Sequence, residues 1–561
     1  MKDTKIKTII DDLQSQVASL DTAPPLVKAL LNLVESLVEK TDKLEEENQQ
    51  LKNENNKLKG ETVPPKVRKQ TDKKSNHSSE AERKRRSARE KPKKGGTKKS
   101  KVKIDRAQKL TIAPEALPKD AKLAGVKKTV IQDVKFVTDT VEFERQMYYS
   151  KSENKTYTAP LPPGYEGEYG PTIKSWTKAF YSEAKMTQGT IAWVFNTVGS
   201  VISKTTISRM LTGKANEPFH EEKESIVKAG LKSTSYQHLD DTSGRESGQN
   251  RYVNVLANEY YSAFFTLMKK DRLSVIEMLS VGELKFLFNE LAFELMDVMN
   301  IPPKHIEILK ESTSTDYCKR PEVDKLLAQI FPNPKKHQNY RKLILEATAI
   351  AAYRKSEYAI KHLIVDDAPQ FKLITDYLGL CWVHEGRHYK KLNPVFKSHQ
   401  TILEHFLDDF WDYYRKLLVY KQTPSTELAL SLTNQFEELF SQNTDYEKLN
   451  QQLLKTKVKQ KKLLLVLDYP DIPLHNNPAE LAARVQARTR DVHLHTMSAS
   501  GTKIKDTLAT LAVTAKKLNV NFFNYLYDRI TKHYEMTSLA ELITLKSKAD
   551  KKLSNAQLVP T

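Results

Sequence analysis

The sequence predicts a mixed α/β protein with helical insertions, preceded by a parallel coiled coil, a basic linker and a small β/helical region. Three observations lead to this fold class. Leucines recur at every seventh position near the start, a polar and strongly basic stretch follows, and short apolar strands then alternate with long helical patterns. A chain of 561 residues can bury a sizeable core in several domains.

The first predicted element, residues 1–60, is a leucine-zipper coiled coil. Leucines occupy positions 30, 37, 44, 51 and 58, which we assign to heptad position d. Position a then holds Val27, Val34, Thr41, Asn48 and Asn55. Asparagine at position a favours a parallel two-stranded coil, so we expect a homodimer. The alternative is a solvated charged helix whose leucines are spaced by chance, and five consecutive matches argue against it.

Residues 61–106 predict a basic, disordered linker. They contain 18 Lys and Arg against 6 Asp and Glu, a net charge of +12 out of +20 for the whole chain. With almost no large apolar residues, this segment cannot bury a core. Its charge predicts an anionic partner, and nucleic acid is the first expectation because lysine and arginine neutralise phosphates without reading sequence.

Two small regions follow the linker. Residues 107–170 predict a β-rich module, and residues 171–230 predict helices. Helical patterns at 187–198 and 203–211, joined by a turn at Gly199, are typical of a helix-turn-helix that binds DNA. Paired helices with a glycine turn also occur in proteins that do not bind DNA, so both interpretations stay open.

The rest of the chain predicts a core interrupted by helices. Three consecutive strands are expected at 236–240, 251–257 and 261–268, and two later strands at 362–365 and 380–383. The predicted division is core strands at 231–269 and 356–396, helical insertions at 270–355 and 397–470, C-terminal helices at 471–535 and a tail at 536–561.

Three acidic residues stand at the ends or heads of these elements. Asp240 and Asp366 each end an apolar strand, and Glu480 lies at the head of a helix. Three carboxylates held together could bind two Mg²⁺ ions for an in-line phosphoryl displacement. Each acid taken alone is better explained as a helix cap or a turn former. The order strand-Asp, strand-Asp, helix-Glu is what favours the metal site.

Four segments extend this pattern into a family resemblance. They are Leu239-Asp240-Asp241-Thr242, Val365-Asp366-Asp367-Ala368-Pro369-Gln370-Phe371, Cys381-Trp382-Val383-His384 with Arg387, and Asn476-Asn477-Pro478-Ala479-Glu480 with Arg484. In this order they resemble the transposases of the IS66 insertion-sequence family, within the DDE group that has an RNase H-like catalytic core. The resemblance covers roughly residues 100–530.

The resemblance implies a catalytic and metal-binding triad of Asp240, Asp366 and Glu480. Asp241 takes the position of the family's Glu and Asp367 that of its Gly, so neither is assigned to the triad. The implied cofactor is Mg²⁺, two ions per site, which Mn²⁺ could replace. The implied activity is strand cleavage at transposon ends and transfer of the 3′-hydroxyl into target DNA, with accessory proteins of the same element as further partners.

Other residues are assigned roles around this triad. We expect DNA contacts from basic side chains, which could alternatively form a solvated helix face: Arg387, Arg484, Arg488, Arg490 and Lys503. His384, Asn476 and Asn477 are expected to support the triad from the surrounding layer of residues. Cys381 and Trp382 are expected in the core, because a zinc site would need more ligands than Cys318 can add.

The chain departs from the family in three ways. Residues 125–160 contain no cysteine where the family has a zinc finger, Leu481 replaces the usual Arg, and residues 270–355 are longer than the family norm. None of these departures removes one of the three acids, so we expect an active enzyme. The alternatives are an inactive or domesticated DNA-binding protein derived from a transposase, and a nuclease without strand transfer.

The cysteine content and hydropathy predict where the protein works. Two separated cysteines fit a reducing compartment, and we recognise no signal peptide and no long apolar run. We expect a cytoplasmic, nucleoid-associated prokaryotic protein without a membrane partner.

Overall fold

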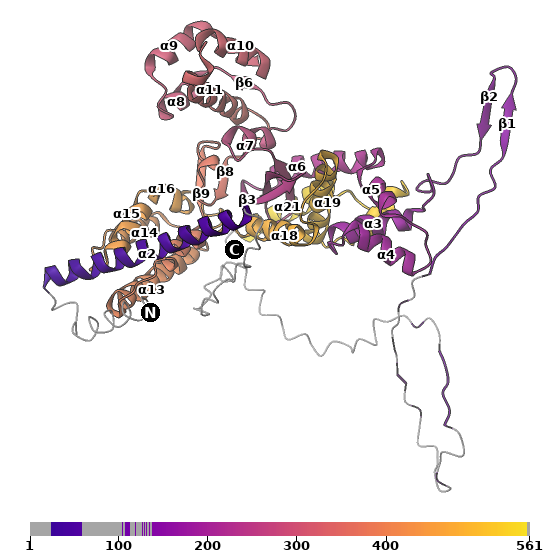
Figure 1. The fold of residues 1–561 in the computed structure, drawn as a ribbon, viewed down its shortest axis with the longest axis horizontal. Coiled ribbons are helices and arrows are strands. Elements are labelled where there is room, and N and C mark those ends of the chain that lie inside the picture. Colours follow the sequence, from indigo (N-terminus) through magenta and orange to yellow (C-terminus); the bar gives the residue numbers. More distant parts are fainter. Residues whose placement is uncertain are drawn as a thin grey trace.

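The computed structural model describes residues 24–58 and 137–557, together with scattered positions between 104 and 134. The predicted basic linker, residues 61–106, lies outside these described residues except for Ile104. The helices α8 to α11 (residues 290–354) extend to the top of the view and α13 to α15 (residues 397–457) to the left, whereas the hairpin of β1 and β2 (residues 147–158) projects at the right (Figure 1). None of the helices in the described part of the chain combines the length and apolar character that a membrane crossing requires.

A mixed five-stranded sheet lies at the centre, in the order β5-β4-β3-β8-β9. Its strands are β3 (Tyr236–Glu246), β4 (Gln249–Ala257), β5 (Ser262–Leu267), β8 (His362–Val365) and β9 (Tyr377–Leu380). The first three are antiparallel neighbours, whereas β8 and β9 run parallel to β3. This confirms the predicted three-stranded meander, and the mixed sheet with its many helices fits an RNase H-like core.

The central strands form from apolar segments that are buried in the sheet. All four residues of β8 are buried, as expected for a short apolar strand in the parallel part of a sheet. The second half of β4 is also buried throughout. At the free edge, α19 (Ala499–Lys517) covers β5: the side chains of Asp506, Thr510 and Thr514, one helical turn apart, accept hydrogen bonds from backbone N–H groups of alternate β5 residues. This protects an edge that could otherwise pair with another chain.

Two strand predictions were wrong in their bounds. β3 continues past Asp240 to a hairpin turn in which Ser247 and Gly248 have positive φ angles of 48° and 78°. Asp240 therefore lies within a strand and not at its end. The strand expected at 380–383 stops at Leu380, because α12 (Trp382–Lys390) begins immediately afterwards with Cys381 as its N-cap.

Helices cover the sheet. α18 (Asn477–His493) packs on β4 through Ala479, Ala482 and Ala483, whose small side chains allow a close approach. The remaining helices around this core are α6 (Glu217–Ser233), α20 (Phe522–Ile530) and α21 (Leu539–Gln557).

The two insertions are helical, as predicted. The first contains the short strands β6 (Phe286–Leu287) and β7 (Tyr317–Cys318) and the helices α7 (Arg272–Leu279), α8 (Glu290–Val298), α9 (Pro303–Ser312), α10 (Arg320–Ile330) and α11 (Pro334–Arg354). The second contains α13 (Lys397–Tyr420), α14 (Thr426–Phe440), α15 (Glu447–Lys457), α16 (Gln460–Leu463) and α17 (Leu465–Asp468). Between them, the single-turn helix η5 (Pro369–Phe371) follows β8.

The N-terminal elements also follow their sequence signals. α2 (Pro25–Leu58) confirms the long heptad helix, while its pairing with a second chain stays a prediction. The hairpin of β1 (Met147–Ser150) and β2 (Lys155–Thr158) precedes the helices α3 (Pro171–Ser182), α4 (Gln188–Thr197), α5 (Lys204–Thr212) and η4 (Lys214–Asn216). Thr187 and Ser203 cap α4 and α5 at the predicted positions, and DNA binding by this helix pair stays a prediction.

Candidate active site

Asp240 on β3 lies beside Asp366, which directly follows the last residue of the neighbouring parallel strand β8. The paired residues of β3 and β8 include His238 with Ile364, and each aspartate stands two residues beyond its paired residue. Because parallel strands keep a constant register, the same offset brings the two aspartates to the same level of the sheet. The charge of Asp366 raises the pKa of Asp240, which agrees with this placement. The structure thus brings together two of the three acids predicted from sequence.

Neither aspartate is neutralised by a cation. Among the described residues, no basic side chain forms an ion pair with Asp240 or Asp366, and Oδ1 of Asp366 is buried without a hydrogen-bond partner. Burial, together with the charges of Asp366 and Glu480, raises the pKa of Asp240 to about 7. Burial also raises the pKa of Asp366, although His384 opposes this shift. Buried carboxylates with raised pKa values are typical of functional sites.

The adjacent aspartates are, by contrast, fully engaged. Asp241 Oδ2 lies 2.9 Å from Nζ of Lys270, and its Oδ1 accepts a hydrogen bond of 2.9 Å from Gln370. Asp367 pairs at 3.0 and 3.1 Å with two lysines, Lys372 and Lys459. Burial alone would raise the pKa of Asp367, but these lysines lower it below its usual value. In each pair of adjacent aspartates, the second one, Asp241 or Asp367, is therefore paired with lysine, whereas the first one is not.

Glu480 is held by arginine. It lies in the first turn of α18, and Nη1 and Nη2 of Arg387 donate to its two carboxylate oxygens at 3.2 and 2.9 Å. Arg484, one turn along the helix, is 3.9 Å away. No three His, Cys, Asp or Glu side chains in the described part of the chain are already grouped to hold a metal ion. The carboxylate oxygens of Asp240 and Asp366 nevertheless suit a hard divalent cation, because the two groups lie close together and no basic side chain in the described part of the chain forms an ion pair with either.

Asn476 connects the segments that carry these acids. Its side chain is buried, donates a hydrogen bond of 2.9 Å to the carbonyl oxygen of Leu239, and lies 3.2 Å from Nδ1 of His238. Its backbone N–H donates to Sγ of Cys381 at 3.3 Å. Its own carbonyl oxygen accepts the N–H of Glu480 at 3.1 Å. The predicted supporting role of Asn476 thus has a geometric basis.

The remaining motif residues are structural neighbours of this network. Cys381 is buried, and burial raises the pKa of its thiol to about 12, so the sulfur accepts hydrogen bonds as an uncharged group. Trp382 is fully buried and donates to the carbonyl oxygen of Leu463 at 2.8 Å, which confirms its core position. His384 follows on α12, where its charge acts on Asp366. Asn477 is the first residue of α18.

The basic residues expected to bind DNA have different surroundings. Arg484 and Arg488 are exposed on α18 and share one helix face with Glu480, four residues apart. Arg490 instead donates to the carbonyl oxygen of Ser243 on β3 at 2.7 Å. Lys503 is exposed and 3.3 Å from Glu217.

Sequence reasoning missed the lysines that pair with Asp241 and Asp367. Lys270 follows β5, and Lys459 lies in the second insertion, and neither position carries a signal that links it to an acid far along the chain. Gln370 lies in one of the motif segments, so its contact with Asp241 was closer to being foreseen.

The chain is similar to known proteins over segments that form this site. Residues 363–504, which carry Asp366, the Cys381 segment and Glu480, match the family model described as "Transposase IS66 family". The chain is also similar to "Uncharacterized protein y4jO" of Sinorhizobium fredii (strain NBRC 101917 / NGR234), with 30% identity over 306 residues. That alignment covers 54% of this chain and 94% of the relative.

The raised pKa of Asp240 predicts a stabilising substitution. In the unfolded wild-type chain the carboxyl group of Asp240 has its usual pKa of 3.8, and in the folded protein its pKa is about 7. The free energy of unfolding therefore falls as the pH rises between these two values. Asn cannot ionise, and Asp240→Asn should therefore be more stable by roughly 2 kcal/mol at about pH 8, with the gain growing from acidic to neutral pH. Urea unfolding in EDTA at several pH values measures this difference in stability.

The control is Asp241→Asn, which breaks an ion pair with Lys270 and should bring no gain in stability. A loss of stability in Asp240→Asn at high pH would contradict the electrostatic interpretation.

The arginine contacts of Glu480 predict unequal effects on stability. Arg387→Ala leaves a largely buried carboxylate without its two hydrogen bonds and should lower the free energy of unfolding by about 1–3 kcal/mol. Arg484→Ala removes an exposed charge that lies 3.9 Å from Glu480, and should change the free energy of unfolding by less than about 0.5 kcal/mol. Equal effects of the two substitutions in chemical denaturation would show that Arg387 does not hold Glu480.

Proposed function

Because the chain belongs to the IS66 transposase family, we propose that it cleaves DNA at transposon ends and joins the freed 3′-hydroxyl groups to target DNA. One observation carries this proposal: Asp240 and Asp366 lie side by side without a counter-ion, whereas Asp241 and Asp367 next to them are paired with lysines. A protein that needed these acids only for folding would gain stability by neutralising them as well.

The proposed cofactor is Mg²⁺, held by Asp240, Asp366 and Glu480. Two such ions, which Mn²⁺ could replace, would activate the attacking oxygen and stabilise the leaving oxygen of an in-line displacement. Asp240 and Asp366 offer their oxygens directly. Glu480 can take part only if its carboxylate exchanges the Arg387 guanidinium for the cation.

Arg387 then has a second role in the proposal. Its guanidinium neutralises Glu480 in the protein alone and has the planar donor geometry that binds phosphate oxygens. We propose that DNA phosphates bind the guanidinium of Arg387 in place of Glu480, so that the Glu480 carboxylate becomes free to bind the cation when DNA is present. Arg484 and Arg488, exposed on the same helix face as Glu480, extend this surface for phosphates.

Other parts of the chain are proposed to hold DNA away from the site. The helix pair α4–α5 is suited to reading a major groove, and residues 61–106 add a net +12 charge for contacts that do not depend on sequence. A homodimer, together with any accessory proteins of the element, would allow both transposon ends to be held in one complex in the nucleoid.

The test compares acids within each neighbouring pair. Purified protein is incubated with Mg²⁺ and DNA that carries the sequences flanking its gene, and nicked and joined products are measured. Asp240→Asn, Asp366→Asn and Glu480→Gln should abolish both products. The controls Asp241→Asn and Asp367→Asn should retain activity, reduced by no more than about 10–100-fold, the usual effect of losing a residue around a metal site.

Three other results would overturn parts of the proposal. Specific DNA binding without cleavage by the wild-type protein would favour a DNA-binding protein derived from a transposase. Cut ends without joined molecules would indicate a nuclease. Loss of activity in Asp241→Asn but not in Asp240→Asn would place the first acid one residue later.

A further inference from the structure

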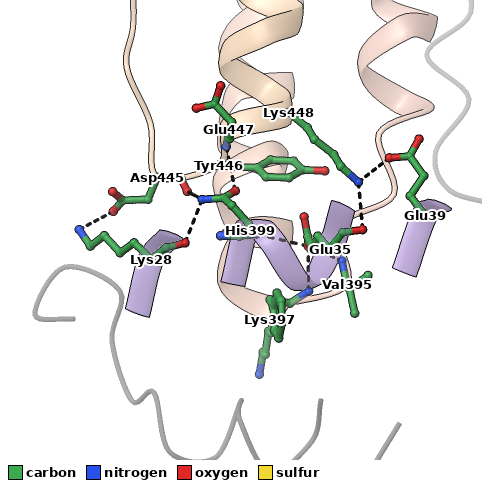
Figure 2. Close-up of polar contacts among 12 residues, drawn as sticks. Lys28, Glu35, Glu39, Val395, Lys397, His399, Asp445, Tyr446, Glu447 and Lys448 are labelled. Carbon is green, nitrogen blue, oxygen red and sulfur yellow. Dashed lines mark hydrogen bonds and ion pairs between the residues drawn. The ribbon is translucent and has the colours of Figure 1, made fainter. Parts of the chain in front are cut away.

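The first half of α2 docks on the second insertion of its own chain. Leu31 is 2% exposed and packs with Phe396, which precedes α13, while Val27 and Val34 cover the same cluster. These two valines occupy heptad position a, so this part of the helix already buries residues that the coiled-coil prediction assigned to a partner chain. The docked face also carries polar side chains that meet the starts of α13 and α15 (Figure 2).

Glu35 supplies the N-terminal cap that α13 lacks. The N-cap residue of α13 is Phe396, and its side chain accepts no hydrogen bond from the backbone of the helix. Oε1 of Glu35, which is 1% exposed, accepts the backbone N–H groups of Val395 and Phe396 at 2.6 and 3.2 Å. A carboxylate at this end of a helix is favoured by the helix dipole and by the unpaired N–H groups.

The environment of Glu35 keeps its carboxylate charged. Burial alone would raise its pKa, but His399 and the N–H groups of Val395 and Phe396 lower it below the usual value. Nδ1 of His399 is 3.3 Å from Oε1 of Glu35, and its ring stacks on Tyr446 at a centroid distance of 4.9 Å.

Asn32 caps α15 in the same way. Its Oδ1 accepts the backbone N–H of Glu447 at 3.1 Å, and its Nδ2 donates to the carbonyl oxygen of Asp445 at 3.0 Å. The N-cap residue of α15, Tyr446, provides no side-chain cap of its own. Two ion pairs surround these caps: Lys28 with Asp445 at 2.8 Å, and Lys448 with Glu39 at 2.6 Å. One helix thus completes the ends of two others.

The opposite face of α2 is apolar and exposed. We call it the leucine ridge; it consists of Leu26, Leu30, Leu33, Leu37, Leu44 and Leu51, which are 82%, 47%, 55%, 53%, 64% and 65% exposed. In the docked half these leucines lie three and four residues apart, which places them on one side of the helix. Beyond Glu39 the ridge continues at intervals of seven, and residues 40–52 of α2 are all exposed.

We propose that α2 works through two independent faces: its polar face fixes it to α13 and α15 of its own chain, and its leucine ridge binds the same ridge of a second copy. The seven-residue spacing continues through the free half of the helix, where Asn48 occupies position a, and this pattern is specific to a parallel pair of identical helices. The second insertion then serves to fix the dimerising helix firmly to the catalytic unit. This inference does not depend on the proposed DNA chemistry.

The experiment breaks one face at a time in the full chain. The ridge variant is Leu44→Lys with Leu51→Lys; both leucines are already exposed in the single chain, so their loss removes no packing within it. Its matched control is Glu46→Lys with Asn53→Lys, on the same half of α2 but away from the ridge. The docking variant is Asn32→Ala with Glu35→Ala. Sedimentation measures the oligomeric state, and hydrogen exchange measures the amides of Val395, Phe396 and Glu447.

The wild-type protein and the matched control should be dimers with these amides protected. The ridge variant should be a monomer with unchanged protection. The docking variant should stay a dimer while the three amides exchange at least about tenfold faster, since they lose hydrogen bonds, two of them to a charged acceptor. A monomeric wild type would overturn the ridge assignment. Loss of protection in the ridge variant, or of the dimer in the docking variant, would show that the two faces are not independent.

Discussion

The buried side chain of Asn476 is the constraint on which the geometry of this site depends. It bonds the carbonyl oxygen of Leu239, which directly precedes Asp240, while its backbone bonds the thiol of Cys381 just after β9 and the N–H of Glu480 one turn into α18. A buried amide must satisfy several donors and acceptors at once, so these partners cannot shift independently. These hydrogen bonds connect the start of α18, which carries Glu480, to β3 and to the segment after β9.

The same arrangement explains how the chain tolerates a cluster of acids. Four carboxylates close to the site are divided into two that are paired with lysines and two that are not. Glu480 is held by Arg387, which lowers the net negative charge of the cluster. Burial, together with the remaining repulsion from Asp366 and Glu480, raises the pKa of Asp240, and a bound cation would relieve this electrostatic strain.

Much of this could be predicted from sequence, because the signals were local. The three-stranded meander, the strand before Asp366, the paired helices α4 and α5 and the helix of Glu480 all lie where apolar periodicity and caps indicate. The choice of Asp240 over Asp241 and of Asp366 over Asp367 came from the family resemblance, and the pattern of ion pairs now supports it.

The errors have a common physical cause, which is that they depend on distant partners. β3 runs on past Asp240 through polar residues, because pairing with β4, and not its own apolar pattern, holds that half of the strand. Arg490 stays a predicted DNA contact, but its hydrogen bond to the carbonyl oxygen of Ser243 on β3 was not foreseen. The capping of α13 by Glu35 joins residues 360 positions apart, and nothing local to either segment announces it.

The proposed cation site depends first on Asp240 and Asp366. The position of Mn²⁺ in crystals of the full chain, located by its anomalous scattering, tests whether these two acids hold a cation. We expect Mn²⁺ bound between the carboxylates of Asp240 and Asp366, and no such peak in Asp240→Asn. Mn²⁺ bound elsewhere, or bound at the same place when Asp240 is replaced, would contradict it.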